Sequence, residues 1–475
     1  MSLFAALLAT QIVPFWAPTP DGAGYLSIAR SIAHGGPVEN MGSPKLHYAP
    51  GYPLLISPAF WFGDRPFLLL QVLQWLWAVA FMLEVYRWAQ RWMAGSELWI
   101  TALTMSNVSL WIHARTTISE MPFMALLVWT ANAMDRLSEE KTPRGAAYWS
   151  LLIAALTVAL SMIRPVGILV LTGYAVVVFL KLRRGEMSWR RAIGTMFAIG
   201  TPAAVAIMAL LVYEARNAAA TGVRGDPTYL HEFRADDMPL PVQLLEGVRV
   251  RASEVGRLLV PGMNKSYAKP FTWLNANMLI YIPLFFTMAW AWWNVAGESG
   301  NTLLFMLPCY LALYIVYPSD QGTRYLLPLL PVLVACLWWF VWYQTRHRTQ
   351  ILTALVVAHL LVAFGYSTHS TLRLARLNDE WRTIDSFASI MNRDTRPSVC
   401  WNAPFGIREL EMVATDRWCA ELRGADTAVP PEAGWIVTAA DSPNCPGFVE
   451  RAREGDLKLL ARVQHVSQFR SKSPR

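Results

Sequence analysis

Three arginines have the residue type and the positions of an anion site. Arg115, Arg164 and Arg324 each stand in a short connection between apolar runs. A guanidinium group binds phosphate oxygens through paired N–H groups, so three of them at one membrane face would hold a phosphorylated group. A single arginine at a membrane boundary often extends its head into water without a ligand. Three arginines on one face favour an anion site over this alternative.

Two carboxylates accompany these arginines. Asp21 opens a segment in which Tyr25, Ile28, Ala29 and Ile32 recur at helical spacing, which predicts an amphipathic surface helix ended by His34-Gly35-Gly36. Asp is also a favoured N-cap, and both roles stay open. Glu120 follows Thr117 at the spacing of a capping box, which competes with a role beside Arg115.

A Pro- and Gly-rich segment runs from His47 to Leu55 and includes Tyr52. This composition predicts a bent, extended path rather than a helix. An ordinary loop with interfacial tyrosines explains it as well as a substrate-binding segment does.

The elements that position these residues are membrane spans. Of the 475 residues, 54% are hydrophobic, 16% are charged and 12% are aromatic. A soluble domain has about 25% charged residues. The composition excludes a disordered or ordinary cytosolic protein and predicts an all-α polytopic membrane protein. The net charge of +8 fits basic loops at a membrane, and no basic stripe with interleaved aromatics suggests nucleic acid.

About eleven apolar runs predict the spans: 2–18, 66–86, 97–113, 121–135, 147–163, 166–182, 192–213, 272–293, 301–317, 325–343 and 351–367. Basic residues fill alternate connections, among them Arg87, Arg91, Arg136, Lys141, Arg183 and Arg184. The positive-inside rule places these connections and the N-terminus in the cytoplasm. The connections 19–65 and 214–271 and the C-terminus then face outward.

Two domains are expected. Residues 1–367 form the transmembrane domain, and residues 368–475 form a small extracytoplasmic α/β module with a helix near Trp381–Met391 and a strand near Trp435–Thr438. The outer connection 214–271 is expected to be partly helical. Cys400, Cys419 and Cys445 lie in the tail, where one pair is a candidate disulfide.

The span interiors carry almost no charge. A coupled transporter places ionisable residues and broken helices near the membrane midplane, often in repeated halves, and the sequence shows neither. The chemistry is therefore expected at the outer face.

Several motifs resemble the GT-C glycosyltransferases, in particular the protein O-mannosyltransferase, aminoarabinose-transferase and RgtA/B/C/D-like branch. The chain carries them in order over residues 20 to about 331: Asp21-x-x-x-Tyr25, Ala49-Pro50-Gly51-Tyr52-Pro53-Leu54, Ser119-Glu120-Met121-Pro122, Ile163-Arg164-Pro165 and Arg324-Tyr325-Leu326-Leu327-Pro328. Gly22 stands where many members carry a second acid.

The resemblance implies transfer of a sugar from a polyprenyl-phosphate donor to an acceptor hydroxyl of a glycan, lipid or protein, with inversion. Asp21 would be the general base, and Arg324 and Arg164 would stabilise the leaving lipid phosphate. Glu120 with Arg115 would position the sugar or the loop. Further substrate-binding candidates are Tyr25, His47, Tyr52 and Tyr325.

A divalent metal, Mg²⁺ or Mn²⁺, is a candidate cofactor, with Asp21, Glu39 and Glu120 as candidate ligands. Bacterial inner membrane, with a periplasmic C-terminus, is the expected location. Two other classes stay open: a lipid or polysaccharide transporter or flippase, and a scaffold whose tail binds a partner. Only the transferase requires Asp21.

Overall fold

The computed structural model describes residues 1–36, 38, 49–221, 239–260, 278–298, 301–316, 323–391, 398–401, 407–415, 419–422, 433, 435–442 and 448–462. The chain divides into two compact units. Unit 1 comprises Met1–Ile12 and Gln71–Thr368, and unit 2 comprises Val13–Leu70 and His369–Arg475. Two of the three divisions fall inside helices, α4 (Phe67–Trp92) and α16 (Arg348–Asp379), and the third lies between Ile12 and Val13.

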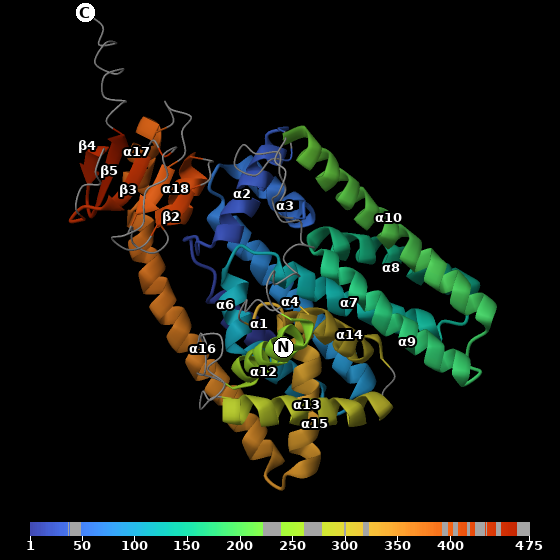
Figure 1. Cartoon of the computed structure of the whole chain (residues 1–475). Helices are drawn as coiled ribbons and strands as arrows, with labels where there is room; N and C mark the ends of the chain where they lie inside the picture. Colours follow the sequence, from blue (N-terminus) through green and yellow to red (C-terminus); the bar gives the residue numbers. More distant parts are fainter. Residues whose placement is uncertain are drawn as a thin grey trace, which may run out of the picture. The chain divides into compact units, whose positions relative to one another are not determined.

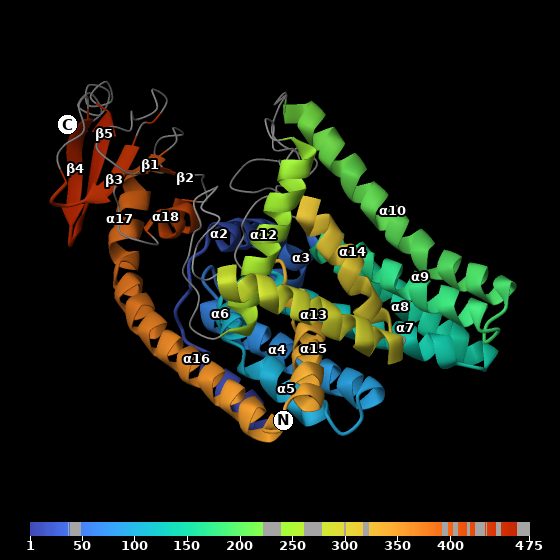
Figure 2. The ribbon, with the colours of Figure 1, turned by 60° about the horizontal axis from the view of Figure 1, so that its bottom comes forward.

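The regular elements among the described residues of unit 1 are all helices. Besides most of α4 and α16, its elements are α1 (Ser2–Ala9), α5 (Glu97–Ser106), α6 (Val108–Arg115), α7 (Glu120–Glu139), α8 (Pro143–Ile163), η2 (Pro165–Leu169), α9 (Val170–Arg183), α10 (Trp189–Thr221), α12 (Leu240–Leu259), α13 (Met278–Glu298), α14 (Thr302–Val316), η3 (Leu327–Leu329) and α15 (Leu330–Gln344). The helices α8, α9 and α10 lie side by side in both views (Figures 1 and 2), and α13 packs against α15. The helix α12 confirms that the connection 214–271 is partly helical.

Seven helical segments among the described residues are long and apolar enough to cross a membrane: 67–92, 143–163, 165–183, 189–209, 278–296, 327–344 and 348–377. They present large apolar side chains outward, for example Leu151 (74% exposed) and Trp293 (73% exposed). Such surfaces are stable when they contact lipid chains. The predicted polytopic helical fold is confirmed, whereas the count of eleven spans is not.

Two expected spans are interrupted. In the first run, only the eight residues of α1 are helical, a rise of about 12 Å against the roughly 30 Å of a bilayer core. Pro14 and Pro18 follow it, and proline opposes helix continuation. The run 97–113 breaks at Asn107, whose side chain accepts from the Ser109 amide at 3.0 Å and donates to the Leu258 carbonyl at 2.7 Å.

Two glycines allow helices of unit 1 to approach closely. A Cβ atom on Gly247 of α12 would lie 1.8 Å from the Ile315 carbonyl oxygen of α14. A Cβ atom on Gly173 of α9 would lie 2.2 Å from the Thr302 carbonyl oxygen of the same helix. Small residues at such crossings bring helix backbones together in membranes.

Unit 2 contains α2 (Pro20–Ala33), α3 (Gly51–Ile56), η1 (Ser57–Phe62), α17 (Trp381–Met391), α18 (Ile407–Thr415) and a five-stranded sheet. The strands β1 (Ser398–Trp401), β2 (Cys419–Leu422), β3 (Trp435–Ala439), β4 (Phe448–Glu454) and β5 (Leu457–Arg462) lie in the order β2-β1-β3-β5-β4 (Figure 2). β1 is parallel to β2 and β3, and β5 is antiparallel to β3 and β4. The expected small α/β module is confirmed, with α17 and β3 where the sequence predicts them.

Specific contacts join residues 13–70 to the C-terminal segment. Arg30 donates to the Val413 carbonyl at 3.0 Å, and Arg65 forms a bidentate ion pair with Asp385. The ring of Trp381 stacks on Phe67 at a centroid distance of 5.8 Å. One division, between Thr368 and His369, lies one residue from the expected domain boundary, and Val13–Leu70 falls in the same unit as the C-terminal segment.

The tail cysteines are described in part. Cys400 is a buried thiol that donates to Oε2 of Glu411 at 3.0 Å, so it does not contribute to the candidate disulfide. Cys445 and the side chain of Cys419 lie outside the described residues.

Candidate active site

Asp21 stands in the first turn of α2. The N-cap is Thr19, whose hydroxyl accepts from the Gly22 amide at 2.9 Å. The alternative that Asp21 is the N-cap is therefore wrong, because Thr19 already occupies that position and Pro20 follows it. Asp21 is partly exposed and lies two positions into the helix, where the helix dipole favours a negative charge.

Tyr25 and Tyr52 meet inside unit 2. Their rings contact edge to face, with centroids 4.9 Å apart, and both side chains are buried. The helix α3 carries Tyr52, so the prediction of an extended path there is wrong. Pro53 falls in the first turn of α3, where a proline costs no hydrogen bond. His47 and Glu39 lie outside the described residues.

Glu120 begins α7 in unit 1. The N-cap of this helix is Ser119, and no side chain caps it. The capping box between Thr117 and Glu120 is therefore absent, and the Glu120 carboxylate has other partners.

Glu120 is bound by two arginines. The Oε1 atom accepts from Nη2 of Arg164 and from Nε of Arg324, and Arg164 also donates to the Ser119 hydroxyl at 3.0 Å. The Glu120 side chain is fully buried, whereas Arg164 is 12% exposed and Arg324 is 21% exposed. Oε2 has no hydrogen-bond partner among the described residues.

Burial opposes the ionisation of Glu120, but the guanidinium groups of Arg164 and Arg324 outweigh it and lower the pKa to about 2. Glu120 is outside the seven candidate spans. The carboxylate therefore carries one negative charge at neutral pH against two positive charges. We name the three residues the Glu120 cluster. It has a net charge of +1 and two partly accessible guanidinium groups, as an anion site requires.

Interruptions between helices position both arginines. Arg164 is the C-cap of α8 in extended conformation (φ −148°, ψ 122°), and Pro165 after it starts η2. Arg324 lies in the turn before η3, which a hydrogen bond of 3.0 Å between the Thr323 and Ser109 hydroxyls holds. Each arginine thus lies at a helix end, where its charge can reach a ligand.

Aromatic rings extend from the Glu120 cluster. Tyr325 stacks on Tyr314 of α14, with centroids 4.7 Å apart, and Tyr314 lies 4.9 Å from Tyr310. Arg251 of α12 lies 5.8 Å from the Tyr314 ring and forms a fully buried ion pair with Glu254 at 2.7 Å.

Sequence reasoning missed Tyr310, Tyr314, Arg251 and Glu254. The only available signal was the charged residues of the connection 214–271, because the tyrosines sit within an apolar run. His113, also missed, lies close enough to interact electrostatically with Glu120.

Arg115 has a different environment from the one expected. Its side chain is buried and its Nη1 donates to the Ser367 carbonyl at 2.8 Å. Gln71 donates to the Arg115 carbonyl at 2.7 Å and Gln74 to the Ile118 carbonyl at 2.9 Å. These bonds fix the segment before α7, while the ion pairs of Glu120 run to Arg164 and Arg324.

The candidate residues thus fall in both units. Unit 1 holds Arg115, Glu120, Arg164, Arg324 and Tyr325, and unit 2 holds Asp21, Tyr25 and Tyr52.

Of the candidate metal ligands, Glu120 does not fit a cation. Its pairing with two guanidinium groups leaves no negative charge for a metal. Among the described residues, no group of three His, Cys, Asp or Glu side chains has the arrangement of a metal site.

Known structures share this fold. ArnT from Cupriavidus metallidurans bound to undecaprenyl phosphate has a TM-score of 0.56 at 11% identity, covering 100% of this chain and 99% of that chain. Its apo state has a TM-score of 0.55. The Archaeoglobus fulgidus oligosaccharyltransferase in complex with Zn and sulfate has a TM-score of 0.53 at 10% identity, covering 92% of this chain and 67% of that chain. No family model and no curated protein sequence matches.

The chain therefore shares the fold of ArnT and of the archaeal oligosaccharyltransferase, which confirms at the level of fold what the resemblance to GT-C glycosyltransferases implies. With its seven apolar helices, it is an integral membrane protein.

Proposed function

We propose that the protein is a glycosyltransferase that moves a sugar from a polyprenyl-phosphate-linked donor to an acceptor hydroxyl on the extracytoplasmic side. The observation that carries the proposal is the Glu120 cluster, in which Arg164 and Arg324 converge on one buried carboxylate. ArnT, whose fold is similar, was crystallised with undecaprenyl phosphate.

Asp21 would act as the general base. It takes the proton of the acceptor hydroxyl while the acceptor oxygen attacks the anomeric carbon of the donor sugar. The bond from that carbon to the lipid-phosphate oxygen breaks on the opposite side. A single displacement of this kind inverts the anomeric centre and needs one carboxylate.

Arg164 and Arg324 would bind the departing lipid phosphate. Negative charge on this phosphate grows as the glycosidic bond breaks, and fixed guanidinium groups stabilise that growth. Glu120 holds both arginines in place, and Tyr325, the residue after Arg324, carries a ring that stacks on Tyr314. Arg115 is assigned a positioning role, because it fixes the segment that leads into Glu120.

Asp21 would contact the acceptor, and Tyr25, Tyr52 and His47 are further candidate contacts. The acceptor classes are a glycan, a lipid or a protein. The proposal retains the location in a bacterial inner membrane, with the N-terminus in the cytoplasm and the C-terminus in the periplasm. Asp21 and Glu39 remain the candidate metal ligands, and a chelator arm in the assay tests metal dependence.

The test is sugar transfer in liposomes by the full-length protein, with a panel of radiolabelled polyprenyl-phosphate sugars and candidate acceptors. We expect Asp21→Asn to abolish transfer, a loss of about 10²–10⁴ in rate, because the base is gone. Thr19→Ala is the matched control. It removes the cap of the same helix, at a cost of about 1 kcal/mol, but keeps the carboxylate.

The proposal expects Thr19→Ala to retain transfer. Normal turnover by Asp21→Asn would reject the assigned base. Movement of intact donor lipid across the membrane by folded protein, with no sugar transferred to any acceptor, would instead indicate a flippase.

A further inference from the structure

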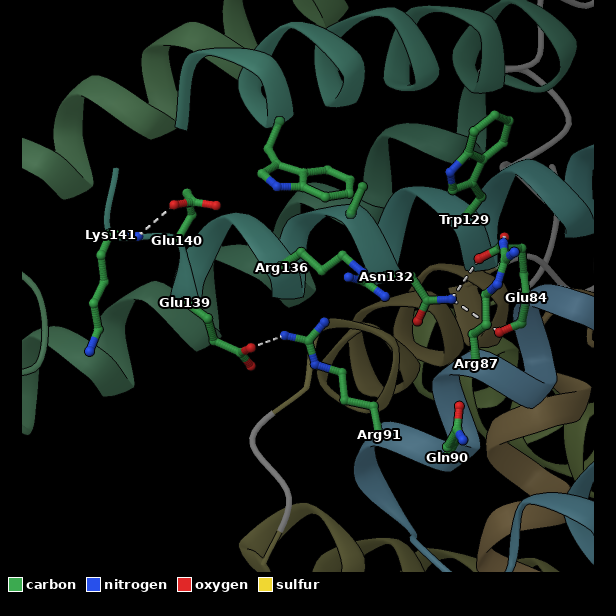
Figure 3. A pocket seen from close by; sticks show the side chains of 12 residues that line it. Glu84, Arg87, Gln90, Arg91, Trp129, Asn132, Arg136, Glu139, Glu140 and Lys141 are labelled. Atoms are coloured by element: carbon green, nitrogen blue, oxygen red, sulfur yellow. Dashed lines mark hydrogen bonds and ion pairs between the residues drawn. The ribbon is translucent and has the colours of Figure 1, made fainter. Parts of the chain in front are cut away.

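A second polar region of unit 1 lies at the other end of α7 from Glu120. A cavity of about 800 Å³ opens between the last turns of α4 and α7 and the start of α8 (Figure 3). Its basic and aromatic lining residues are Arg87, Arg91, Arg136, Lys141, Trp129 and Trp149. The proposed function assigns no role to this cavity.

The carboxylates of the cavity are engaged. Glu84 accepts from Arg87 at 2.5 Å and from the Asn132 amide at 2.9 Å. Glu139 forms an ion pair with Arg91 (Figure 3). The carboxylate therefore neutralises the arginine in each of these pairs.

The third carboxylate is held by the connection into α8. One oxygen of Glu140 accepts from the amides of Lys141 and Thr142, at 3.0 and 2.8 Å, and from the Thr142 hydroxyl at 2.8 Å. It caps this turn and is not directed to a cavity cation.

Two cations remain. In the part of the chain that the structure describes, the side chains of Arg136 and Lys141 form no ion pair, and both are exposed. The Arg136 guanidinium carbon lies 5.7 Å from the centre of the Trp149 ring, which supports the planar group from one side. Figure 3 shows Arg91 and Arg136 extending from α4 and α7 into the same space.

We propose that this cavity binds the phosphate headgroup of an anionic membrane phospholipid, with Arg136 and Lys141 as the cations that hold it. The cavity lies at the ends of two candidate spans, 67–92 and 143–163. Basic pockets between membrane helices bind anionic headgroups, and tryptophans such as Trp129, 40% exposed, are typical of that depth. The volume suits a headgroup. This inference does not depend on the proposed glycosyl transfer.

The test is native mass spectrometry of the delipidated full-length protein, titrated with phosphatidylglycerol or with phosphatidylcholine of the same chains. The double variant R136Q/K141Q removes the two cavity cations to which the proposal assigns the phosphate and keeps Arg87 and Arg91. The matched control, R183Q/R184Q, removes two exposed basic residues at the end of α9, outside the cavity. Melting temperatures verify that all variants are folded.

We expect the wild type and R183Q/R184Q to bind phosphatidylglycerol in preference to phosphatidylcholine. R136Q/K141Q should bind it about twenty-fivefold more weakly, since each cation near a lipid phosphate contributes about fivefold. Equal weakening in both variants would show that net charge alone attracts the lipid and would overturn the site.

Two further arms identify the source of the phosphate. Inorganic phosphate at matched concentration should not displace phosphatidylglycerol, because the lipid chains add affinity. If a polyprenyl phosphate displaces it at tenfold lower concentration, the cavity is a carrier-lipid site and the phospholipid assignment is wrong.

Discussion

Arg324 donates its Nε–H to Oε1 of Glu120, a carboxylate 204 positions earlier in the chain. The same oxygen accepts from Arg164, so one buried atom joins α7, the end of α8 and the turn before η3. The carboxylate offsets one of the two positive charges and holds both guanidinium groups at helix ends. Removing it would leave two arginines without their shared partner.

The first prediction concerns stability. Glu120→Gln should destabilise the protein by about 3 kcal/mol, because it leaves two largely buried cations without their counter-charge. Glu139→Gln, in the last turn of the same helix, is the control. It breaks a surface pair in which Glu139 is 52% exposed, and it should change stability by less than about 1 kcal/mol. Thermal unfolding in detergent measures both, and equal shifts would contradict the burial argument.

The second prediction concerns pH. The pKa of Glu120 is lowered in the folded state, so its contribution to stability is full above the unfolded value of 4.5 and is lost as pH falls toward about 2. The difference in melting temperature between wild type and Glu120→Gln should be constant from pH 7 to about pH 5 and shrink below pH 4.5. A difference that already shrinks between pH 7 and pH 6 would show that burial dominates.

The third prediction concerns the leaving phosphate. Arg324→Gln should lower the turnover of sugar transfer by about 10²–10³, the usual loss when one donor to a developing anion is removed. Arg324→Lys should recover only part of this, because lysine lacks the guanidinium fork. Arg346→Gln, an exposed residue of the connection after α15, is the control. If Arg324→Gln raises KM alone, the arginine binds donor without stabilising the transition state.

The fourth prediction concerns helix packing. Gly247→Ala should cost about 1–3 kcal/mol, because the new methyl group would overlap the Ile315 carbonyl oxygen. Gly200→Ala in α10 is the control, since its Cβ would meet nothing within 4 Å. Alanine favours helix over glycine, so this variant should unfold at the same or a slightly higher temperature. A lower melting temperature for Gly200→Ala alone would contradict the assignment.

Short sequence patterns predicted the helices whose formation depends on interactions between near neighbours in the chain. Apolar runs predicted α4, α7 to α10 and α13 to α16, the spacing of Tyr25, Ile28 and Ile32 predicted α2, and the segment 381–391 predicted α17. Predictions that depended on competition between neighbours were wrong. Thr19 rather than Asp21 caps α2, and Pro53 is accommodated in the first turn of α3.

The sequence by itself determined the class of structure, because hydrophobic periodicity and helix capping act over a few residues. It also identified Arg164, Glu120 and Arg324 as residues of interest, since charge beside an apolar run is costly. Only the tertiary structure decided which of them meet. The pairing of Glu120 with Arg164 and Arg324, and the stack of Tyr314 on Tyr325, join segments brought together by the packing of α7, α8, α14 and η3. Packing between distant segments determines these contacts, so the spacing of residues within one segment does not predict them.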